Sequence, residues 1–212
     1  MSKVRWGVIG TGSIANAFAH SIEHCNHSEL IAVFGRNKET LQTLSTKFDA
    51  IGINDIDELV TLNTIDAIYI ATPHSSHFEY ALHAIKNNKH VLCEKPIAMN
   101  HIESMVLFGL AKDCGVFLME AYMYRTHPQT FNILKNIESL CDTNEKVEIN
   151  SSFGFHAEIS KDHRLRNPML GGGAIMDVGC YPLSMSKLLA GRILNKPYAD
   201  PISIEASGNL DE

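Results

Sequence analysis

The sequence has no long apolar run, no cysteine pair and no basic stripe, and each absence narrows the class of protein. No stretch approaches the roughly 18 apolar residues that a membrane helix needs, and the start lacks the apolar segment and cleavage site of a secretory signal. The five cysteines include no C-x-x-C pair, which favours reduced thiols over a disulfide framework or a zinc site. We therefore expect a cytoplasmic protein that does not bind membranes.

Neither nucleic acid nor a metal ion is expected as a partner. The net charge of -6, from 18 basic and 24 acidic side chains, includes no basic patch that would attract nucleic acid. The pair His74-x-x-His77 has no acidic neighbour that would complete a metal site. We interpret His20, His24 and His27 as the polar face of a solvated helix, because no outer-shell partners accompany them.

Between residue 3 and about residue 120, short apolar runs alternate with amphipathic stretches. The runs predict strands at 4–9, 30–34, 66–71, 90–93 and 116–119, with a weaker one at 51–53. They alternate poorly, as is typical of a parallel sheet covered on both faces. Helical periodicity fills the gaps, and Asp55-x-x-Glu58 and Asn100-x-x-Glu103 resemble capping boxes. This order predicts an α/β fold, a doubly wound Rossmann sheet, over residues 1–122.

The pattern changes near residue 121. A helix is predicted from about 126 to 140, a strand over 146–156, a helix over 174–190 and a strand over 202–207. Two strands and one main helix cannot close a core of their own. We therefore expect residues 123–212 to begin a second domain that this chain contains only in part.

A glycine loop follows the first predicted strand, with the sequence Gly10-Thr11-Gly12-Ser13-Ile14-Ala15. In this context Gly10 permits a tight turn, Gly12 lets the backbone approach a pyrophosphate, and Ala15 allows close helix packing. The helix start at Ser13 and Ile14 then offers free N–H groups to phosphates. The plainer interpretation is a glycine turn that binds nothing, and the order of strand, turn and helix favours the dinucleotide site.

The residues at the end of the second predicted strand indicate whether the coenzyme is NAD or NADP. NAD enzymes usually place an acid there to hold the ribose hydroxyls, but this sequence reads Phe34-Gly35-Arg36. Arg36 has the geometry to bind a 2′-phosphate through paired hydrogen bonds, and the alternative is a solvated loop arginine. We expect NADP, with NAD as the second possibility.

Two further motifs carry a family resemblance. They are Val91-Leu92-Cys93-Glu94-Lys95-Pro96 and the run from Gly171-Gly172-Gly173 through Asp177 to Tyr181-Pro182. Together with the glycine loop, these motifs resemble the glucose–fructose oxidoreductase / inositol dehydrogenase (Gfo/Idh/MocA) family. Tyr181 and the run 117–121 are similar to a closer group, that of the dimeric dihydrodiol dehydrogenases and the NADP-dependent xylose dehydrogenases.

The resemblance also implies an architecture. Family members usually run well past 300 residues, and their C-terminal α+β domain is built on an open, largely antiparallel sheet that mediates dimerisation. This sequence departs from that pattern by stopping after the second strand of that domain, which bears on the completeness of its substrate pocket. A homo-oligomer is expected for the full-length form.

The resemblance implies catalytic roles for three residues. Lys95 and Tyr181 would act at the reacting hydroxyl, and Asp177 would orient the substrate or the lysine. A tyrosine with a pKa of about 10 is a poor base at neutral pH, but a nearby ammonium favours its phenolate. Whether Tyr181 or Lys95 passes the proton stays open at this point. The structural alternative is that Asp177 caps a helix and Tyr181 packs as an aromatic.

The remaining expected cofactor contacts follow other strand ends. Thr72 and Pro73 follow the fourth strand, with His74 and His77 beyond them, and the resemblance implies a place for Glu94 near the nicotinamide ribose. Arg125 would face the cofactor or substrate, or form a surface ion pair.

The resulting prediction is an oxidoreductase that transfers a hydride between NADP and a hydroxyl carbon of a sugar or cyclic diol. The family also contains non-catalytic dinucleotide-binding regulators and glycosidases that use bound NAD, and both remain alternatives.

Overall fold

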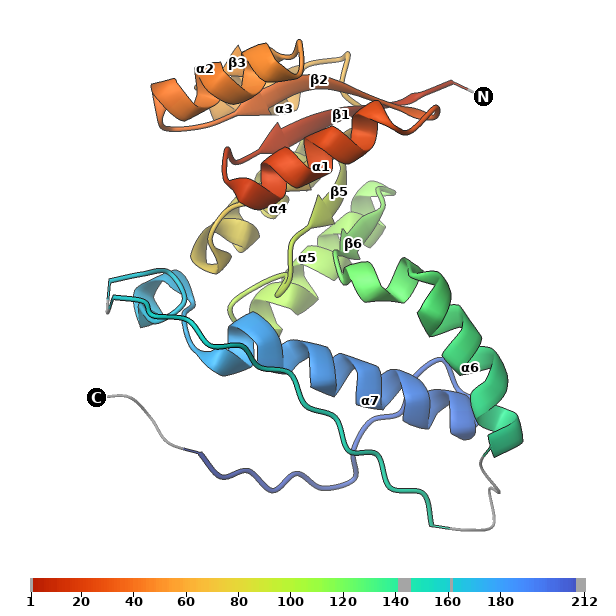
Figure 1. Cartoon of the computed structure of the whole chain (residues 1–212). Helices are drawn as coiled ribbons and strands as arrows, with labels where there is room; N and C mark the ends of the chain where they lie inside the picture. Colours follow the sequence, from red (N-terminus) through yellow and green to blue (C-terminus); the bar gives the residue numbers. More distant parts are fainter. Residues whose placement is uncertain (1, 141–145, 161, 209–212) are drawn as a thin grey trace. The chain divides into compact units, whose positions relative to one another are not determined.

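The computed structural model describes residues 2–140, 146–160 and 162–208 (Figure 1). It forms two compact units. The first comprises Met1–Ala121 and Glu158–Asp177, and the second comprises Tyr122–Ala157 and Val178–Glu212. Because Glu158–Asp177 belongs to the first unit, Lys95 and Asp177 lie in the same unit although 82 residues separate them.

The first unit alternates strands and helices along its first 120 residues. Its elements are β1 (Val4–Ile9), α1 (Ser13–Glu23), β2 (Ser28–Phe34), α2 (Lys38–Lys47), β3 (Ile51–Ile53), α3 (Ile56–Thr61), β4 (Ala67–Ile70), η1 (His74–Ser76), α4 (His77–Lys86), β5 (His90–Cys93), α5 (His101–Cys114), β6 (Leu118–Glu120) and η3 (Pro168–Leu170). All six strands predicted from the sequence are present, with boundaries moved by at most two residues.

The six strands form one parallel sheet in the order β3-β2-β1-β4-β5-β6. The direction of strand order therefore reverses between β1 and β4, and in open α/β sheets a ligand binds at such a reversal, beyond the carboxyl ends of the strands. Ile9 pairs with Ile70, and Ile70 with Cys93. The residues after these three strands consequently meet at one edge of the sheet.

Helices cover both faces of this sheet, as the α/β prediction requires. On one face Val8 packs with Ala15 and Ala19 of α1 and with Leu41 and Leu44 of α2; Figure 1 shows these two helices beside β1 and β2. On the other face, residues of β1 and β4 pack with Ala81, Ala84 and Ile85 of α4 and Leu107 of α5. Burial on both faces explains why the strands read as apolar runs.

Side-chain caps begin several of these helices. The Asn100 side chain accepts a hydrogen bond from the Glu103 N–H, and the Glu103 carboxylate accepts one from the Met99 N–H at 3.0 Å. Asp55 caps α3 through the Asp57 N–H. Both predicted capping positions thus start helices, although the bonds differ in detail from the reciprocal box.

The second unit is mainly helical among its described residues. It contains η2 (Met123–Thr126), α6 (Pro128–Leu140) and α7 (Cys180–Ile193), and α6 packs against α7. The π-helix η4 (Ile175–Gly179) precedes α7 directly. The predicted helix at 126–140 is confirmed.

The two strands predicted in the second unit are wrong. Residues 146–156 and 202–207 contain no strand, and no backbone hydrogen bond joins either segment to another described residue. Except for the partly buried Ile149, their large apolar side chains are exposed, with Phe155 at 58% and Ile204 at 78%. Alternation predicts a strand only where a neighbouring strand and a buried face exist.

Along the described part of the chain, no helix combines the length and apolar character that a membrane crossing requires.

Candidate functional site

The glycine loop between β1 and α1 has the backbone that its sequence demands. Gly10 has a φ of +119°, and a Cβ on it would lie 2.5 Å from the Ala71 carbonyl oxygen, so no other residue fits there. Gly12 is the N-cap of α1, makes no side-chain cap bond, and has nothing within 4 Å of where a Cβ would be. The N–H groups of the first turn, including those of Ser13 and Ile14, have no preceding helical carbonyl. This geometry suits a phosphate at the start of α1.

A cavity of about 400 Å³ opens beside this loop. Its lining comes from three strand ends, from α4 and from one distant segment. It comprises Gly10, Thr11, Gly12, Phe34, Gly35, Arg36, Asn37, Ala71, Thr72, Pro73, Tyr80 and Arg164. Arg36 is exposed and forms no ion pair within the described ranges. The structure therefore brings the glycine loop, Arg36, Thr72 and Pro73 together around one cavity.

Arg164 is a lining residue that sequence reasoning missed. It lies in the irregular segment before the glycine run and has no periodic or motif context of its own. Its guanidinium lies 3.8 Å from the Asp177 carboxylate. Arg164 thus adds a second cation to the cavity that Arg36 lines.

Lys95 and Asp177 form a nearly buried pair at the same edge of the sheet. The Lys95 ammonium donates to the Asp177 backbone oxygen at 2.5 Å and to its carboxylate at 3.2 Å. Only 13% of the Lys95 side chain and 12% of the Asp177 side chain are exposed. Asp177 therefore fixes the position of the ammonium beyond the end of β5.

The loop that carries Lys95 is held by carboxylates. Glu94 accepts a hydrogen bond from the Tyr69 hydroxyl at 2.6 Å, and Glu120 accepts one from the Ile97 N–H at 2.9 Å. The Glu94 carboxylate is thus tied to β4 and the Glu120 carboxylate to the loop. These bonds set the backbone around Lys95 before any ligand binds.

His77 lies beneath this loop rather than facing a ligand. Its side chain is fully buried, and its two ring nitrogens lie 2.7 Å from the Pro96 oxygen and 2.8 Å from the Thr72 oxygen. Burial lowers the pKa of this imidazole. His77 therefore links the loop after β5 to the loop after β4. The direct contact with the cofactor that we expected from the sequence stays a prediction, and the burial of His77 does not favour it.

His74 connects the loop after β4 to the glycine run. Its Nδ1 lies 2.8 Å from the Gly171 oxygen, the residue is 5% exposed, and burial lowers its pKa. Gly171 has a φ of +76°, and a Cβ there would lie 2.7 Å from the His74 Cβ and the Met99 sulfur. The first glycine of the run is thus required by close packing, which places Asp177 near Lys95.

Tyr181 and Arg125 lie in the second unit. The Tyr181 ring packs against the rings of Tyr122, Tyr124 and Phe153, with centroids 5.4, 6.1 and 5.4 Å away. Arg125 is exposed and donates to the Ser184 hydroxyl at 3.2 Å. The helix predicted over 174–190 is a regular α-helix only from Cys180 onward, because Ile175–Gly179, which contains Asp177, is a π-helix.

Residues 4–122 match the family described as "Oxidoreductase family, NAD-binding Rossmann fold". The chain is similar to a D-xylose 1-dehydrogenase (NADP(+)) of Hypocrea jecorina, with 33% identity over 204 residues that cover 85% of this chain and 51% of the relative. It is also similar to a trans-1,2-dihydrobenzene-1,2-diol dehydrogenase of Xenopus tropicalis, with 31% identity over 84% of this chain and 54% of the relative.

Among solved structures, the chain resembles a 3-ketoreductase of Actinomadura kijaniata in complex with NADP and TDP-benzene. The two share 26% identity with a TM-score of 0.78, over 89% of this chain and 58% of the other. The chain thus spans between half and three-fifths of the length of these relatives.

Proposed function

This chain belongs to the Gfo/Idh/MocA family of oxidoreductases, and from that premise we propose that it transfers a hydride between NADP and a hydroxyl-bearing carbon of a sugar or cyclic diol. The observation that carries the proposal is the nearly buried Lys95–Asp177 pair at the sheet edge that also carries the glycine loop. The Lys95 ammonium at this edge can donate a hydrogen bond to a substrate oxygen. The substrate class is supported by the relatives, which are named for a sugar and a diol.

The cavity supports NADP as the coenzyme. The glycine loop and the start of α1 would hold the pyrophosphate, since Gly12 leaves open space there. Arg36 would pair with the 2′-phosphate, and Arg164 adds a second cation to the same cavity. Thr72 and Pro73 would border the ribose. Bound there, NADP supplies the nicotinamide carbon that accepts or donates the hydride.

The polar residues then have distinct tasks. Lys95 would donate a hydrogen bond to the substrate oxygen, and Asp177 holds the ammonium in place through two bonds. Glu94 and Glu120 keep the surrounding loop in position. The Tyr181 hydroxyl would exchange the proton with the substrate oxygen, with Lys95 as the competing carrier.

Steady-state reduction of NADP with a panel of aldoses and cyclic diols tests this proposal. Lys95→Ala and Tyr181→Phe should each lower turnover by ~10²-fold or more, the usual contribution of a positioned acid or base. Lys187→Ala is the matched control, because Lys187 also pairs with an aspartate, at 2.6 Å from Asp200, but on an exposed surface. Its turnover should be unchanged.

Three outcomes of these measurements would change the proposed function or assign the roles of Lys95 and Tyr181. Tight NADPH binding without turnover of any substrate would favour a non-catalytic regulator. Normal turnover by Lys95→Ala would remove the pair from the mechanism. Loss of the acidic limb of the pH–rate profile for NADP reduction in Tyr181→Phe, with the limb kept in Lys95→Ala, would assign the proton to the tyrosine, because a base that accepts the hydroxyl proton is inactive when protonated.

Assembly and location complete the proposal. The family resemblance supports a homo-oligomer for the full-length form, which sedimentation equilibrium would test. The free thiols at Cys25, Cys93 and Cys114 support a cytoplasmic setting.

A further inference from the structure

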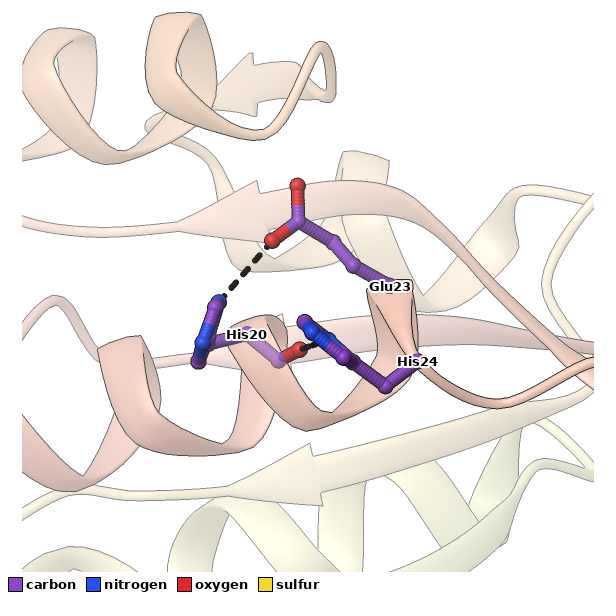
Figure 2. Close-up of side chains that lie close together, drawn as sticks. All are labelled: His20, Glu23 and His24. Atoms are coloured by element: carbon purple, nitrogen blue, oxygen red, sulfur yellow. Dashed lines mark hydrogen bonds and ion pairs between the residues drawn. The ribbon is translucent and has the colours of Figure 1, made fainter.

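The last turn of α1 gathers two imidazoles and a carboxylate on its exposed side. His20 and Glu23 lie in the helix and His24 is its C-cap, so the three sit at relative positions i, i+3 and i+4 on one face (Figure 2). One ligand atom from each lies within 4.8 Å of the others. We propose that His20, Glu23 and His24 bind a divalent late transition-metal ion of the Zn²⁺, Ni²⁺ and Cu²⁺ class.

His24 is already oriented as a metal ligand. Its Nδ1 lies 3.0 Å from the His20 backbone oxygen, and a carbonyl only accepts hydrogen bonds, so Nδ1 carries the proton. The neutral ring then keeps its lone pair on Nε2. A carbonyl that fixes the tautomer in this way is the usual outer-shell partner of a metal-binding histidine. The same bond satisfies one of the otherwise unpaired carbonyls of the last helical turn.

His20 and Glu23 supply the other two ligands. The His20 Nδ1 lies 3.0 Å from a Glu23 carboxylate oxygen, so a proton shared between these atoms occupies the place that an ion would take. The partial negative charge at a helix C-terminus favours a cation there. Imidazole and carboxylate together suit Zn²⁺, Ni²⁺ and Cu²⁺ better than Mg²⁺ or Ca²⁺.

The spacing needs little adjustment. Two ligands at 2.0–2.2 Å from one ion lie at most about 4.4 Å apart, so small rotations of these exposed side chains close the observed separations. Water would complete the coordination. The 11-residue helix is about 16 Å long, which separates the site from the glycine loop at its other end. The site is therefore independent of the proposed catalytic function.

Calorimetric titration of the metal-free 212-residue chain with ZnCl₂ and with NiCl₂ at pH 7.5 tests the proposal. One ion should bind per chain, and because the ion displaces protons from its ligands the affinity should fall as the pH is lowered. The double variant His20→Ala/His24→Ala should weaken binding by at least tenfold, because even loss of an outer-shell partner costs about 10–100-fold. Zinc should raise the melting temperature of the wild type and not that of the double variant.

Two neighbours provide matched controls. His27→Ala and Cys25→Ser remove the nearest other imidazole and thiol in the sequence and should leave affinity unchanged. Cu²⁺ electron paramagnetic resonance should show two coordinated imidazole nitrogens in the wild type and one in either single histidine variant. Absence of binding, binding that survives the double substitution, or loss of binding in Cys25→Ser would each overturn the proposal. The substituted side chains are all exposed, so each variant should fold normally. An unchanged melting temperature in the absence of metal would verify this.

Discussion

Lys95 and Arg36 are two cations in opposite situations. Lys95 is held by Asp177 and is nearly buried, whereas Arg36 is exposed on the rim of a cavity and forms no ion pair with a described residue. A charge fixed by a buried partner has one position and suits a reacting atom. An exposed guanidinium at a rim suits a phosphate that arrives with the ligand.

Arg36→Ala should change the choice of coenzyme. Charge-assisted hydrogen bonds contribute about 1.5–3 kcal/mol, so the ratio of NADPH to NADH affinity should fall by about tenfold or more. Fluorescence titration with both coenzymes measures this ratio. Lys38→Ala removes a neighbouring exposed cation that does not line the cavity and should leave the ratio unchanged, and an unchanged ratio in Arg36→Ala would assign the 2′-phosphate elsewhere.

At the scale of elements, the two glycines of the loop serve different purposes: one is needed for the fold and the other for ligand binding. Gly10 satisfies the fold, since its φ is positive and the Ala71 carbonyl leaves no room for a side chain. Gly12 satisfies the ligand, since its surroundings are open. The same motif therefore contains one residue that matters for stability and one that matters for binding.

Substitution of each glycine by alanine should separate these roles. Gly10→Ala should lower the free energy of unfolding by about 1–3 kcal/mol, the cost of a strained backbone conformation. Gly12→Ala should leave unfolding nearly unchanged but weaken NADPH binding, because the new methyl group occupies the approach of the pyrophosphate. Urea denaturation and coenzyme titration measure the two effects. Equal loss of stability in both variants would contradict this division.

The elements also show what the sequence could predict. The strands of the first unit were predictable because burial on both faces leaves apolar runs between helix signals, as at 4–9 and 90–93. The strands expected at 146–156 and 202–207 were wrong, because alternation reports the residue order and not the presence of a neighbour to pair with. Sequence motifs located Lys95 and Asp177. Arg164 and the support that His77 gives to two loops depend on contacts that no local pattern encodes.

At the scale of the whole molecule, the buried imidazoles of His74 and His77 and the Asp66 carboxylate couple stability to acid. Arg5 donates to the Asp66 carboxylate at 2.6 Å and 3.0 Å and lowers the Asp66 pKa to about 2, chiefly through that hydrogen bonding. Burial lowers the pKa of His74, and the electrostatic effects of His77, Lys95 and Arg164 act in the same direction, against the bond to Gly171. Burial also lowers the pKa of His77. All three groups therefore bind protons less readily in the folded protein than in the unfolded chain.

The signs of these shifts predict two separate steps of acid destabilisation. An imidazole whose folded pKa is depressed contributes stability above its unfolded pKa of about 6.5, and that contribution is lost as the pH falls below it. The Asp66 contribution is present above its ordinary value of 3.8 and is lost as the pH falls toward 2. The second step should be modest, because both side chains of the Arg5–Asp66 pair are more than a third exposed.

Urea midpoints between pH 8 and pH 2 would resolve the two steps, and two variants assign them. His74→Asn should reduce the step below pH 6.5, with the remainder due to His77, and should leave the step below pH 4. Asp66→Asn should leave the first step and flatten the second. The Asp66 step should also shrink in high salt, since the pair is exposed, while the His74 step should not, since its main cause is burial. A step below pH 6.5 that keeps its full size in His74→Asn would assign it to His77 alone, and would make the support beneath the Lys95 loop the acid-sensitive part of the fold.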